Sequence, residues 1–221
     1  MNINFFLHKL QTKIGANSPI QKISIVPAEN ATIDNCFINV LDRVSQQGGA
    51  IVYGWDLMLT DLLFEAQRHA VWQSPDEKLL DITPRVYKSD SSIFIADNRW
   101  YYNGEVTDNV RINVTDNSVV DDFILVAETI IKLYQTGKRN EDGKLILVNK
   151  ILIAIQILER MKNDLNLFLV NGGNTDSICF CCGKKIYSNC FGVTVKSEME
   201  LILHTSSVLL QQFNSVKDGS T

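Results

Sequence analysis

A cysteine, a histidine and an aspartate occur in the order that thiol chemistry often uses. Cys36 lies in the first turn of a predicted helix, where unpaired amides and the positive end of the helix dipole favour a thiolate. His69 lies in a predicted strand, and Asp81 lies in the next strand, beyond a turn that contains Pro75. A carboxylate beside the imidazole would orient the ring, and the ring would deprotonate the thiol. The set predicts Cys36 as nucleophile, His69 as base and Asp81 as orienting group.

Each of the three residues also has a structural interpretation. Cys36 is of a type that packs as a small buried apolar residue. His69 would then be a hydrogen-bonded strand histidine, and Asp81 would cap the chain before Pro84. Because a triad is defined by geometry and not by residue order, both interpretations stay open. The oxyanion donor is also open, since Gln21 and the backbone amide of Cys36 are both candidates.

A second group of residues could bind a metal. Four cysteines, Cys179, Cys181, Cys182 and Cys190, lie within twelve residues. Thiolates at short spacing beside a glycine suit a tetrahedral zinc ion, and four protein ligands leave no position open for catalysis. We therefore expect structural zinc held by these four cysteines. The alternatives are His204 as the fourth ligand in place of Cys182, or several buried free thiols.

The cysteine segment resembles the SEC-C zinc motif, a short element of many bacterial proteins. The resemblance rests on Cys179-x-Cys181, eight residues, then Cys190, with Gly183 and Gly192 in place. The family has cysteine or histidine directly after the third cysteine, whereas this chain has Phe191. The resemblance implies a zinc-binding element that docks a protein or peptide partner.

The upstream triad resembles the papain-like and transglutaminase-like superfamily. Cys36 at a helix start, His69-Ala70-Val71-Trp72 in one strand and Leu80-Asp81-Ile82-Thr83-Pro84 in the next carry that resemblance. It implies thiol-dependent acyl transfer or amide hydrolysis. The stretch from Glu65 to Pro84 is also similar to the main domain that often precedes SEC-C motifs in uncharacterised bacterial proteins. A non-catalytic zinc-binding adaptor is the alternative function.

Composition limits the kinds of partner and the cellular location that we expect for this chain. The chain has 221 residues and a net charge of −4, which does not favour a general nucleic-acid binder. We expect no membrane segment and no secretory signal, and the odd count of five cysteines argues against a disulfide framework. A cytoplasmic location is the default expectation. The oligomeric state does not follow from the sequence.

Periodicity predicts an α+β fold: a helix packed on a small antiparallel sheet, then a helical layer and a small C-terminal zinc element. The predicted domains are residues 1–137 and 138–221, with the zinc element at about 177–193. The predicted strands cover 22–26, 50–55, 64–73, 78–83, 92–96 and 100–102, and the predicted helices cover about 32–48, 118–137, 144–169 and 197–213.

Overall fold

The computed structural model describes residues 3–218, with side chains as far as residue 211. Residue contacts divide the chain into two units. The first comprises Met1–Asn103 and Asn109–Val114, and the second comprises Gly104–Asp108 and Thr115–Thr221. Each unit has its own set of secondary-structure elements, and the two are described separately below.

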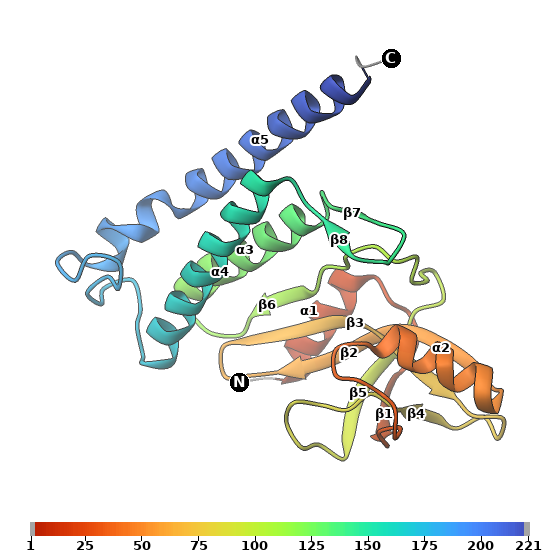
Figure 1. Ribbon diagram of the computed structural model, residues 1–221. Coiled ribbons are helices and arrows are strands. Elements are labelled where there is room, and N and C mark those ends of the chain that lie inside the picture. Colours follow the sequence, from red (N-terminus) through yellow and green to blue (C-terminus); the bar gives the residue numbers. More distant parts are fainter. Residues whose placement is uncertain (1–2, 219–221) are drawn as a thin grey trace. The chain divides into compact units, whose positions relative to one another are not determined.

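The first unit is built on a six-stranded sheet that closes into a small barrel (Figure 1). The strand order is β2-β5-β1-β4-β3-β6, and the ring closes because β2 also pairs with β3. The strands are β1 (Ile20–Ile25), β2 (Ala50–Leu59), β3 (Leu63–Gln73), β4 (Leu79–Asp81), β5 (Ser91–Ala96) and β6 (Val110–Asn113). The β2–β3 hairpin is the longest pairing, and it presents His69 opposite Gly54.

One strand pair within the described sheet is parallel. β1 runs parallel to β4, with Ile25 beside Asp81. The pairing continues past the strand ends, where Val26 N–H donates to the Asp81 carbonyl at 2.8 Å and Ala28 N–H donates to the Ile82 carbonyl at 2.9 Å. The parallel pair therefore holds Asp81 beside the segment that leads into the second helix.

Two helices belong to this unit, α1 (Ile3–Ile14) and α2 (Cys36–Gln47). The apolar side of α2 buries Val40 against Ala70, Trp72 and Ile82 of the barrel. That burial fixes the helix on the sheet, because apolar area removed from water is the main favourable term in packing. Cys36 is the first residue of α2, so its position depends on how this helix docks.

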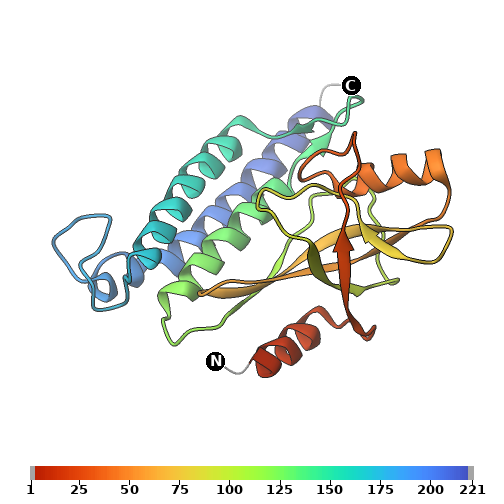
Figure 2. The same ribbon diagram turned by 90° about the horizontal axis from the view of Figure 1, so that it is seen from below.

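The second unit is mostly helical. It contains α3 (Val119–Tyr134), α4 (Asn149–Val170), α5 (Phe191–Asp218), the 3-10 turn η1 (Tyr187–Asn189) and a hairpin of β7 (Lys138–Arg139) and β8 (Leu145–Ile146). Both α4 and α5 pack on α3, and Figure 2 shows the three helices side by side. Among residues 3–218, no helix has the combined length and apolar character needed to cross a membrane.

The mixed α and β class is confirmed, while several finer expectations are wrong. The sheet is not wholly antiparallel, and residues 100–102 form no strand. The helix α1 was not expected, and α5 begins at Phe191 rather than near Ser197. α3 groups with α4 and α5, but contacts alone do not define an independently folding domain, so the boundary at 137 stays a prediction.

Candidate functional site

The barrel brings His69 and Asp81 into contact. Trp72 of β3 lies opposite Leu80 of β4. When this register is continued by one residue, Asp81 lies diagonally across from His69, and both side chains are on the same face of the sheet. His69 Nε2 lies 3.1 Å from Asp81 Oδ1, and the two residues are only 5% and 0% exposed. The N–H direction is not aligned with this oxygen, so the contact is a close ion pair rather than a linear hydrogen bond.

Cys36 is the third member of the cluster. Its side chain is buried at the start of α2 and interacts with the His69 imidazole. Burial alone would lower the pKa of His69, but its interactions with Asp81 and Cys36 outweigh burial and raise that pKa to about 10. The structure thus assembles the three residues that the sequence singled out.

A partly buried arginine that was not predicted, Arg85, holds the other oxygen of Asp81. Oδ1 accepts a hydrogen bond from Thr83 N–H at 3.0 Å, while Arg85 donates to Oδ2 through Nε at 3.1 Å and through Nη2. The remaining end of Arg85, Nη1, lies 2.5 Å from Asp56 Oδ2. Burial would raise the pKa of Asp81, but His69 and Arg85 outweigh burial and lower it, so the carboxylate is ionised.

A buried asparagine connects the segment before Cys36 to the segment after Asp81. Asn39, one turn into α2, accepts from Thr32 N–H at 3.0 Å and donates to the Thr32 carbonyl at 2.8 Å. The same amide donates to Thr83 Oγ1 at 3.1 Å. These bonds fix the start of α2, and with it Cys36, relative to Asp81. The backbone segment between Thr32 and Cys36 includes Asp34 in a left-handed conformation, with φ at 60°.

The start of α2 also supplies candidate oxyanion donors. The first N–H groups of a helix have no intrahelical partner, and in α2 they belong to the turn that Cys36 begins. The other candidate, Gln21, lies in β1 paired with Phe94 of β5. The helix start is therefore the better candidate, because its amides belong to the same turn as the sulfur.

The second unit gathers the sulfur atoms of the cysteine cluster. Sγ of Cys181 lies 3.2 Å from that of Cys179 and 3.3 Å from that of Cys190. The sulfurs of Cys179, Cys181 and Cys190 all lie within 4.8 Å of one another, a set that could hold a metal ion. Zinc–sulfur bonds of about 2.3 Å in a tetrahedron separate the sulfurs by about 3.8 Å, so the set fits with small adjustments.

Cys182 lies at the edge of this trio. Its sulfur is 3.4 Å from that of Cys190. Backbone N–H groups of Lys184 and Lys185 lower the pKa of Cys182 to about 7, which favours its thiolate form. His204, the alternative fourth ligand, is exposed and lies about 20 Å along α5 from Phe191, at about 1.5 Å per residue. That separation excludes His204 from the cluster.

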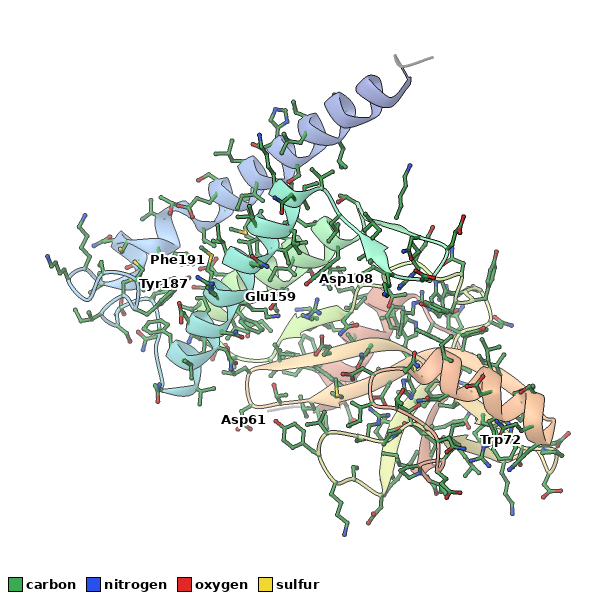
Figure 3. All side chains as sticks on the ribbon, in the orientation of Figure 1. Asp61, Trp72, Asp108, Glu159, Tyr187 and Phe191 are labelled. Atoms are coloured by element: carbon green, nitrogen blue, oxygen red, sulfur yellow. The ribbon has the colours of Figure 1, made fainter. Side chains whose placement is uncertain are left out.

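Aromatic packing attaches the cysteine segment to the helices. Tyr187 is buried, its hydroxyl donates to Asp122 Oδ2 of α3 at 2.8 Å, and its ring stacks on Phe168 of α4 at 5.5 Å. Figure 3 shows Tyr187 and Phe191 together where the cysteine segment meets α5. Phe191, the residue that departs from the SEC-C pattern, is thus a core residue of this unit.

No protein-family model, no curated protein and no solved structure matches this chain. The geometry and chemistry of the two clusters therefore carry the functional argument.

Proposed function

We propose that this protein is a cysteine-dependent acyl-transfer or amide-hydrolysing enzyme of the peptidase, amidase or transglutaminase-like kind. The observation that carries the proposal is the 3.1 Å contact of His69 in β3 with Asp81 in β4, with the buried Cys36 at the start of α2 contributing to the raised pKa of His69. Such a contact between a thiol, an imidazole and a carboxylate is the arrangement that nucleophilic catalysis requires. The resemblance to the papain-like superfamily agrees with this proposal.

Each of the three residues has a defined part in the proposed reaction. The Cys36 thiolate attacks the carbonyl carbon of an amide, and backbone N–H groups at the start of α2 stabilise the oxyanion that forms. The carbon–nitrogen bond then breaks, and the leaving nitrogen takes the proton of the His69 imidazolium. Neutral His69 next removes a proton from water or an amine, which attacks the thioester and releases the thiolate. Asp81 orients the ring throughout.

Alkylation kinetics test this proposal without a known substrate. Mass spectrometry would follow the rate at which iodoacetamide modifies Cys36 near neutral pH. We expect His69→Ala to slow this reaction about tenfold or more, since the imidazolium that stabilises the thiolate is lost. His204→Ala removes an exposed histidine of the second unit and is the matched control. Equal Cys36 rates in the native protein and His69→Ala would overturn the proposal.

We further propose that the cysteine cluster is a SEC-C-like structural zinc site. Cys179, Cys181 and Cys190 would bind the ion, and Cys182, whose thiolate is favoured by two backbone amides, would be the fourth ligand. The closed set of ligands supports a structural role. A chain with four reduced zinc thiolates and a reactive cysteine suits a reducing compartment, which supports a cytoplasmic location.

The second candidate function is a zinc-binding adaptor for a protein or peptide partner. It is favoured by the exposure of two apolar residues beside the cluster, Ile178 at 57% and Val193 at 65%. The alkylation experiment separates the two functions, because an adaptor needs no activated Cys36. We propose that the partner is neither a nucleic acid nor a membrane.

A further inference from the structure

The catalytic proposal leaves two charged residues unexplained, the buried Asp56 and the partly buried Arg85. Arg85 follows the short segment after β4, and Asp56 lies in the middle of β2. Asp56 is only 1% exposed, and a buried carboxylate is costly unless a cation pairs with it. Arg85 is the cation that pairs with Asp56, and the same guanidinium also binds Asp81. One side chain therefore connects the orienting carboxylate to a second strand of the barrel.

The two oxygens of Asp81 have separate partners. Oδ1 faces His69 and Thr83 N–H, whereas Arg85 is the only partner of Oδ2 among the described residues. A fully buried carboxylate without Arg85 would have one unpaired oxygen, and it would rotate or take up a proton to avoid that cost. Either change would withdraw Oδ1 from the imidazole. Arg85 is thus placed to determine which way Asp81 points.

We propose that Arg85, anchored by Asp56, is the positioning residue that fixes Asp81 against His69 and thereby keeps Cys36 reactive. This inference rests on the proposed function, since it assigns a role within the same site. Arginine suits the role because its planar fork reaches two carboxylates at fixed angles, whereas a lysine ammonium is a single point charge. Asp56 Oδ1 has no protein partner among the described residues, so Oδ2 and Arg85 are what hold this carboxylate.

Arg85→Lys is the decisive variant because it keeps the charge and removes the fork. We expect the alkylation of Cys36 at pH 7 to slow about tenfold, and the rate-against-pH curve to move to higher pH. The NMR titration of the His69 ring should move to lower pH in the same variant. A purely structural arginine would change the thermal midpoint without moving either titration.

Two further variants complete the experiment. Asp56→Asn keeps the contact of Arg85 with Asp81 and weakens only the contact of Arg85 with residue 56. It should therefore slow the alkylation of Cys36 by a smaller factor than Arg85→Lys does. This variant also tests the inference if Arg85→Lys does not fold. Arg111→Lys is the matched control, because Arg111 is a buried arginine of the same unit that pairs with Glu65 at 2.9 Å. Its alkylation curve should match that of the native protein.

The outcomes separate this inference from the proposed function. If His69→Ala slows alkylation while Arg85→Lys and Asp56→Asn stay within about twofold of the native rate, the role of Arg85 is overturned and the catalytic proposal stands. If His69→Ala has no effect, the catalytic proposal fails and the positioning role fails with it.

Discussion

His69 is a buried ionisable group whose charge depends on its two neighbours. Burial disfavours the imidazolium, and only the contacts with Asp81 and Cys36 make it the stable form. The same contacts that would activate a thiol therefore contribute to the stability of the barrel. That link makes the protonation of His69 measurable through unfolding as well as through reactivity.

His69→Gln should flatten the dependence of stability on alkaline pH. The folded pKa of about 10 lies above the ordinary value of 6.5, so the contribution of His69 is complete below about pH 6.5 and is lost as the pH rises to about 10. Urea unfolding of the native protein across this range should show a falling free energy of unfolding, and the variant should show a smaller fall. Identical slopes would mean that His69 is neutral in the folded protein.

Tyr187→Phe should destabilise the second unit by about 1–2 kcal/mol at pH 7, because Asp122 loses its hydroxyl donor. Burial raises the pKa of Asp122, while the Tyr187 hydroxyl lowers it. The penalty should therefore shrink as the pH falls and Asp122 takes up a proton. Thermal unfolding at several pH values measures this, with exposed Tyr101→Phe as the control. A penalty that does not change with pH would contradict an ionised Asp122.

At the scale of elements, the docking of α2 determines where the sulfur lies. Val40 attaches the middle of the helix to the barrel, and Asn39 attaches its first turn to the segments around Thr32 and Thr83. The apolar contact is tolerant of small shifts, whereas the three amide bonds are directional. Asn39 is therefore the residue of α2 that most restricts the position of Cys36.

Asn39→Ala should cost about 1–3 kcal/mol, because it removes both bonds to the Thr32 backbone and leaves the buried Thr83 hydroxyl without its amide donor. It should also slow the alkylation of Cys36 in protein that remains folded. Asn35→Ala is the matched control, because the Asn35 side chain makes no capping bond at the same helix start. Chemical unfolding of both variants gives the comparison. Equal costs would show that Asn39 has no special part in fixing the helix.

Local patterns account for what the sequence predicted correctly. The helical spacing of apolar residues indicated α2 and α3, and strand composition indicated the strands that hold His69 and Asp81. The parallel β1–β4 pair and the contact of Arg85 with Asp56 join positions far apart in the chain. No local spacing reports such pairings, and Arg85 after Pro84 had the appearance of an ordinary turn residue.

At the scale of the whole molecule, the two clusters lie in different units. Cys36, His69, Asp81 and Arg85 belong to the first unit, and the four clustered cysteines belong to the helical unit. The proposed zinc site therefore shares no residue with the proposed acyl-transfer site. Loss of the metal should affect one unit and leave the chemistry of the other in place.

Cys190→Ser should reduce bound zinc from about one equivalent to well below half, and it should expose the segment between Gly173 and α5. Metal analysis and hydrogen exchange measure the two effects. Amides of α2 should keep their protection, and Cys36 should keep its alkylation rate. Cys36→Ser, which leaves all four clustered cysteines in place, is the control for metal content. A changed Cys36 rate in Cys190→Ser would contradict the independence of the two sites.

The parallel pairing of β1 with β4 has a consequence for the synthesis of the chain. Cys36 leaves the ribosome before His69 and Asp81, and β1 must wait for β4 before the barrel can close. A nascent chain that ends before residue 69 therefore carries a thiol with neither a base nor an orienting carboxylate. Under the proposed function, Cys36 gains its base and its orienting carboxylate only when the ring of strands is complete, so an unfinished chain carries an unactivated thiol.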